Sequence, residues 1–100
     1  MKIKRIKKLR INNTVFKIIW SKKFSGGNFY FKNKTISIGT KKENIILECI
    51  LHELFEICCL EMGVRYDRTD CETDYLFNFN HQQHTTLICM LSGLIEQFIE

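Results

Sequence analysis

The first forty residues alternate between apolar and polar positions in short runs, which is typical of β-strands. Residues 14–20 are β-branched and aromatic, and we expect them to pair with the preceding basic segment across Asn12-Asn13. Residues 28–31 and 35–38 flank Lys32-Asn33-Lys34 and predict a hairpin. Between residues 14–20 and 28–31, the run Ser25-Gly26-Gly27 predicts a flexible turn.

The period then changes to that of helices. Thr40 followed three residues later by Glu43 resembles a capping box, so we predict a helix from Thr40 to Met62 with Gly63 as its stop. Its apolar residues cover most of the circumference, which predicts burial on several sides. We expect a loop over residues 64–74 and a short strand over residues 75–79.

A second helix should follow that strand. Asn80 can cap it, and Gln83 at the third helical position completes a capping box. An apolar stripe runs along this helix toward its end at about Phe98. The predicted fold class is α+β: a small antiparallel sheet, made of the N-terminal strands and the hairpin, packed against two helices.

Length and composition fit one domain over residues 1–100. The chain has 100 residues, of which 45% are hydrophobic and 26% charged, enough for a single modest core. No apolar run approaches the ~18 residues that span a bilayer. The N-terminus is positively charged but lacks the apolar stretch of a secretory signal, so we expect a cytoplasmic protein and no membrane partner.

The five cysteines are an odd number, which is typical of free thiols in a reducing compartment. Cys49, Cys58, Cys59 and Cys89 lie in apolar helical runs and should be small buried residues. Cys71 lies in the polar loop and should be exposed.

The net charge of +4 is concentrated at the N-terminus, where six of the first ten residues are Lys or Arg. No aromatic or glycine motif of a known nucleic-acid module accompanies this charge. We therefore expect a solvated strand face here rather than a nucleic-acid partner. A nucleic-acid-associated protein that uses this basic N-terminal strand is the weaker alternative.

The most informative motif is a polar interruption of the first helix by His52, Glu53 and Glu56. Residues four apart share a helix face, so His52 and Glu56 could bind one divalent ion. Glu53 lies about 100° round the helix and could act as a base toward water. The spacing is that of the HExxH motif with glutamate in place of the second histidine.

Two further histidines, His81 and His84, lie at the start of the second helix. They are three apart and share a face, and the positive helix end favours neutral imidazoles that can bind metal. A catalytic zinc site needs three protein ligands and an open position. His52, Glu56 and one of this pair would meet that count. We favour His81 as the third ligand, with His84 as the alternative.

The order of these segments resembles the minimal zincin-like metallopeptidase domains, many of which are short proteins of bacteriophages and prophages. The resemblance covers about residues 14–98 and rests on residues 27–38, the run from Leu51 to Glu56 and a second apolar helix. It implies a zinc ion bound by His52, Glu53 as general base and a third ligand from the following helix. The chain departs from the family at Glu56, where the family has histidine.

The resemblance therefore predicts a zinc-dependent metallopeptidase that acts on a peptide or protein, with Tyr66 and Tyr75 as candidates for substrate contact. Residues 36–38 could form the strand against which the peptide pairs. The alternative is a catalytically inactive, zincin-shaped module that acts by protein–protein contact.

Overall fold

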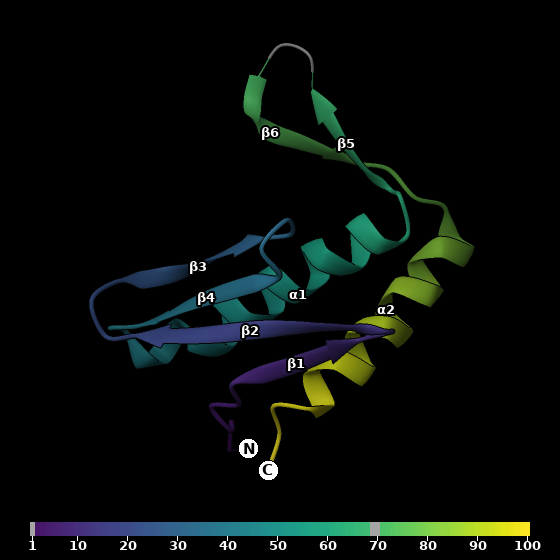
Figure 1. Cartoon of the computed structure of the whole chain (residues 1–100). Helices are drawn as coiled ribbons and strands as arrows, with labels where there is room; N and C mark the ends of the chain where they lie inside the picture. The colour runs from purple at the N-terminus through teal and green to yellow at the C-terminus, as the bar shows by residue number, and fades with distance from the viewer. Residues whose placement is uncertain (1, 69–70) are drawn as a thin grey trace.

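A computed structural model describes residues 2–68 and 71–100 of the chain. The elements, coloured in chain order in Figure 1, are β1 (Lys8–Ile11), β2 (Thr14–Ser21), β3 (Ser25–Tyr30), β4 (Thr35–Thr40), the 3-10 helix η1 (Glu43–Ile45), α1 (Ile46–Glu61), β5 (Arg65–Arg68), β6 (Cys71–Phe77) and α2 (His81–Glu96).

The first four strands form one sheet in the order β1-β2-β4-β3. The β1–β2 hairpin turns at Asn12-Asn13, and β3 and β4 pair antiparallel, as the sequence predicts. The central pair β2–β4 is parallel, which the sequence does not predict. The sheet is therefore mostly antiparallel, and β3 is an edge strand whose only partner is β4.

One face of this sheet is buried by the helices. Apolar residues at alternate strand positions are buried, among them Leu9, Phe16, Ile18, Ile36 and Ile38. They join the buried residues of α1 and α2 in one hydrophobic cluster. Helix α1 packs against β3 and β4, and α2 packs against α1 and β1 (Figure 1). The predicted α+β class, a sheet packed against two helices, is confirmed.

The predicted start of the first helix at Thr40 is wrong. Thr40 is buried at the end of β4, where it pairs with Ser25, and α1 begins only at Ile46 after η1. No side chain caps η1 or α1. Residues 25–27 likewise belong to β3 rather than to a turn. Both errors have one cause: pairing between Ser25 and Thr40 keeps both segments extended.

The other helix signals are confirmed. The Asn80 side chain accepts a hydrogen bond from the Gln83 backbone at 2.8 Å, and the Gln83 side chain accepts one from the Asn80 backbone at 2.9 Å. Gly63, at φ +70°, follows the end of α1. Its N–H donates to Leu60, and the N–H of Val64 donates to Cys59, so the helix ends in a Schellman motif.

The predicted loop after α1 contains a strand. β5 and β6 pair antiparallel as a two-stranded sheet, which projects beyond the end of α1 in Figure 1. The predicted strand over residues 75–79 corresponds to the end of β6, which stops at Phe77. Within the described residues, no helix is long and apolar enough to cross a membrane.

The capping box of α2 yields the first test. Asn80→Ala removes the side-chain acceptor of the Gln83 N–H and should lower the free energy of unfolding by about 1 kcal/mol. Chemical denaturation followed by circular dichroism measures this change. Asn78→Ala, an exposed position outside the helix, is the matched control and should be close to neutral. Equal effects of the two substitutions would contradict the capping role.

Candidate functional site

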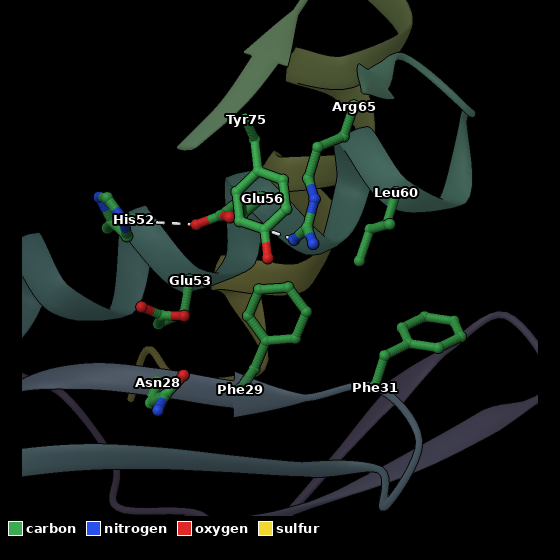
Figure 2. Close-up of a pocket in the computed structure, with 9 residues that line it drawn as sticks. All are labelled: Asn28, Phe29, Phe31, His52, Glu53, Glu56, Leu60, Arg65 and Tyr75. Atoms are coloured by element: carbon green, nitrogen blue, oxygen red, sulfur yellow. Dashed lines mark hydrogen bonds and ion pairs between the residues drawn. The ribbon is translucent and has the colours of Figure 1, made fainter. Parts of the chain in front are cut away.

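The polar row of α1 faces a cleft between this helix, β3 and the β5–β6 hairpin. The cleft has a volume of about 430 Å³. Figure 2 shows the side chains that line it: Asn28, Phe29, Phe31, His52, Glu53, Glu56, Leu60, Arg65 and Tyr75. The helix supplies the titratable groups, while β3 and the hairpin supply mainly aromatic side chains and one arginine.

Helical spacing brings His52, Glu53 and Glu56 together. His52 Nε2 lies 3.4 Å from Glu56 Oε2, and one ligand atom from each of the three residues lies within 4.8 Å of the other two. The His52 side chain is 70% exposed, whereas that of Glu56 is 17% exposed. The group could hold a metal ion with one nitrogen and two oxygen donors, a set that zinc accepts.

Glu53 occupies an unusual position for a carboxylate. The residue is only 5% exposed, and it packs against Gly27 of β3. A Cβ atom at position 27 would lie 3.0 Å from Glu53 Cγ and 3.4 Å from its Oε1, so a side chain at this position would require the Glu53 side chain to shift by a few tenths of an ångström. Among the side chains that the structure describes, none donates a hydrogen bond to the Glu53 carboxylate.

The electrostatic consequence is a pKa of Glu53 above its ordinary value of 4.5. Burial is the largest cause, because desolvation penalises the charged form. His52 acts in the opposite direction, and the neighbouring Glu56 raises the pKa further. A nearly buried carboxyl whose pKa is raised in a cleft is a candidate functional residue.

Glu56 is held from the other side by Arg65 of β5. Arg65 donates a hydrogen bond of 3.1 Å from NH1 to Glu56 Oε1, and its side chain is only 13% exposed. The guanidinium carbon lies 3.7 Å from the ring centre of Tyr75 and 5.6 Å from that of Phe29. Arg65 therefore fixes one carboxylate oxygen of Glu56 and leaves the other directed toward His52 (Figure 2).

The structure does not bring His81 or His84 into this group. Both are exposed at the start of α2, with ring centres 6.3 Å apart. The His84 ring stacks on Phe79 at 6.1 Å, and Phe79 in turn contacts Phe55 of α1. The clustered potential ligands among the described residues are His52, Glu53 and Glu56 alone. The aromatic side chains occupy the place where α2 meets α1, so neither imidazole is available there as a third ligand.

The strand beside the cleft is β3, not the segment 36–38 that the sequence suggested. That segment lies in β4, which is paired on both sides. A second hollow of about 260 Å³ adjoins the cleft along β3, and His52 and Glu53 line both. Together they form a groove along the edge strand from Gly26 to Phe31.

Sequence reasoning missed Arg65 and Gly27. A signal for Arg65 was its position just after the Gly63 helix stop, where the chain turns back along the last turn of α1. Of the two tyrosines proposed to contact substrate, Tyr75 lines the cleft. Tyr66 is 47% exposed and does not line it.

None of the four cysteine side chains that the structure describes contributes a ligand to the group. Cys49, Cys58 and Cys59 are buried free thiols, as predicted, but Cys89 is exposed. Burial raises the pKa of Cys58 to about 11, and burial together with Glu56 raises that of Cys59. Both stay protonated at neutral pH, whereas metals bind the thiolate. The Cys71 side chain lies outside the described residues.

The chain matches no protein-family model, no curated protein and no solved structure. The zincin resemblance therefore rests on the sequence motif alone, and the site is interpreted from its own geometry.

The contact between Gly27 and Glu53 can be tested by substitution. Gly27→Ala places a Cβ 3.0 Å from Glu53 Cγ and should destabilise the protein by about 1–3 kcal/mol through overpacking. In a Glu53→Ala background, Gly27→Ala should lower the free energy of unfolding by clearly less, because the Cγ atom of residue 53 is then absent. Denaturation of the four proteins of this double-mutant cycle measures the coupling, and additive effects would contradict the contact.

The buried carboxyl also predicts a pH-dependent stability. The folded-state pKa of Glu53 is raised above 4.5, so ionisation costs stability at higher pH and nothing well below 4.5, where folded and unfolded chains are both protonated. In metal-free protein, Glu53→Gln should therefore raise the thermal midpoint at neutral pH, and this gain should disappear as pH falls below 4.5. Glu48→Gln, an exposed position on the same helix, is the control and should show no such gain.

Proposed function

We propose that this protein is a metal-dependent hydrolase that cleaves an extended peptide, with zinc as the ion. His52 and Glu56 would bind the ion as two protein ligands, one fewer than a typical catalytic zinc site has, and water and substrate would fill its remaining positions. Glu53 would be the general base. The imidazole and carboxylate lie one helical turn apart with donor atoms 3.4 Å apart, which suits binding to a common ion.

The observation that carries the proposal is the Glu53 carboxylate. The residue is nearly buried, and its burial and the neighbouring Glu56 carboxylate both raise its pKa. Its carboxylate lines the cleft, and neither oxygen is fully enclosed without a partner. Such an arrangement costs stability unless a cation or a proton compensates it. A divalent ion between His52 and Glu56 would supply the cation. The raised pKa suits a group that must accept and release a proton near neutral pH.

In the proposed reaction, a bound zinc ion would supply Lewis acidity toward water and the peptide carbonyl. Glu53 accepts one proton from the attacking water as the oxygen–carbon bond forms. It then delivers this proton to the nitrogen as the carbon–nitrogen bond breaks, which leaves an amine and a carboxylic acid that keeps the second proton of the water. Transfer of that second proton to the amine gives the final carboxylate and ammonium products. Arg65 positions Glu56 through the ion pair of 3.1 Å between their side chains.

The edge strand β3 supports a peptide as the substrate. Its outer edge has no partner strand among the described residues, and the groove follows it past His52 and Glu53. An extended peptide could add to this edge by main-chain hydrogen bonds. Phe29, Phe31 and Tyr75 would then contact its side chains. We also propose a reducing cytoplasm as the location, because Cys49, Cys58 and Cys59 are buried free thiols.

One observation favours a second function, that of an inactive docking module. The Arg65 guanidinium already neutralises Glu56, and the third member of the potential ligand group is Glu53 itself. If Glu53 binds the ion as a ligand, no base remains, and the ion would only stabilise the fold. The groove would then bind a peptide without cleaving it.

Metal analysis and peptidase assays of matched variants distinguish these functions. We expect about one zinc ion per chain, lost in His52→Ala. Glu53→Gln should retain the metal while peptide cleavage falls by about 10²–10⁴-fold, the contribution of a general base. His81→Ala and His84→Ala replace the exposed imidazoles of α2 and should leave metal content unchanged.

Two outcomes would reject the hydrolase. Loss of zinc in Glu53→Gln would identify Glu53 as a ligand and favour the docking module. Unchanged zinc content in His52→Ala would show that zinc does not bind at His52 and would contradict the proposed metal site. The substrate for these assays is a mixture of unstructured peptides, with cleavage followed by mass spectrometry and a chelator-treated sample as the blank.

A further inference from the structure

The charges of this chain are divided between its two halves. Of the 15 Lys and Arg residues, 13 lie in residues 1–42, and none of the 11 Asp and Glu residues does. The four-stranded sheet and its connections lie in this basic half, and Lys8, Arg10 and Lys17 lie in its strands, while the acidic residues follow in the chain. The sheet and its connections therefore carry far more positive charge than the net charge of +4 suggests.

The sheet has one uncovered face, here called the open face. The buried residues of β1, β2 and β4 alternate with residues that point away from the helices. On the open face of β2, Val15 and Ile19 are 47% and 43% exposed, with the exposed Lys17 between them. Both helices pack on the other side of the sheet (Figure 1). No helix or strand among the described residues covers these side chains.

A single row crosses the open face from one edge of the sheet to the other. Strand register places Lys8 opposite Lys17, Lys17 beside Thr35, and Thr35 opposite Tyr30. Two lysines directly opposite each other repel and destabilise the pair. Neither forms an ion pair within the part of the chain that the structure describes. The row ends in Tyr30, which is 51% exposed.

A groove of about 870 Å³ adjoins the basic end of this row. Its lining includes the exposed Lys7, Lys8 and Lys17, and its apolar surface includes Val15 and Ile19. Lys34 also lines it, but its ammonium group lies 3.7 Å from the ring centre of Phe31. None of its lining residues is acidic. Repelling cations around an apolar surface are stabilised by a ligand that presents several negative charges together with apolar surface.

We propose that the open face binds single-stranded nucleic acid. Successive phosphates of one strand would contact the lysines, and a base could stack on Tyr30. An acidic peptide would satisfy the lysines but would not use the exposed phenol ring at the end of the row. The sequence alone did not favour this partner, because only the fold collects these charges and the tyrosine on one surface.

The test is fluorescence anisotropy of a labelled oligothymidylate of about 20 nucleotides, longer than a typical single-strand site. We expect a dissociation constant of roughly 1–100 µM at physiological salt, with affinity falling as salt rises. Lys8→Gln/Lys17→Gln should weaken binding and lower the salt slope by about 0.7 for each lysine removed. Lys22→Gln/Lys23→Gln, which changes two exposed lysines outside the row, is the matched control and should retain the slope.

Substitutions at Tyr30 distinguish the contribution of base stacking to affinity from that of the lysine charges. Tyr30→Ala should weaken binding at least about fivefold, whereas Tyr30→Phe, which keeps the ring, should not. The proposal is overturned if the oligonucleotide does not bind at low salt, or if the row and control double variants lose affinity equally. Unchanged binding by Tyr30→Ala would also overturn the proposal, because no base would then stack on the ring. Equal displacement of the labelled oligonucleotide by poly-L-glutamate and by unlabelled oligonucleotide would overturn it as well and would favour acidic proteins as the partner.

This inference is independent of the hydrolase. The row shares no residue with the His52, Glu53 and Glu56 group, so His52→Ala should bind the oligonucleotide with unchanged affinity. Failure of either proposal therefore leaves the other intact.

Discussion

The arrangement of this molecule depends on the close approach of α1 to the edge strand β3 at Glu53 and Gly27. The absence of a side chain at Gly27 lets the helix lie near the strand, and the same contact excludes water from most of Glu53. Helical periodicity then sets His52 and Glu56 beside this carboxylate. A larger residue at position 27 would push the helix outward and open the cleft, so the geometry of the site begins with a packing constraint.

The sequence predicted those parts of the fold that local physics determines. The alternation of apolar and polar residues identified the strands because helices cover only one face of the sheet. The capping box at Asn80 was identified because both of its hydrogen bonds form within four residues. The same local signature failed at Thr40, because pairing with Ser25 extends β4 through that residue. The parallel pairing of β2 with β4 depends on the order of strands in the sheet, which no local pattern specifies.

In the candidate site, too, local features were predictable from the sequence and long-range contacts were not. Spacing along one helix placed His52 near Glu56, and the structure gives 3.4 Å between their donor atoms. The expected imidazole from α2 depended on how two helices face each other, and there Phe55 and Phe79 meet instead. Arg65 was missed for a related reason: the Gly63 helix stop indicates that the chain turns there, but the return over α1 depends on the pairing of β5 with β6.

Strand β3 connects the two surfaces to which functions are assigned here. Because side chains alternate along a strand, Gly27 and Phe29 lie on the helix side while Tyr30 lies on the open face. An edge strand with one partner is held less firmly than β2 or β4, which have two. The same strand therefore carries Gly27, against which Glu53 packs, and Tyr30, which ends the lysine row. The two proposed sites share no side chain, yet they share the one strand whose position sets the geometry of both.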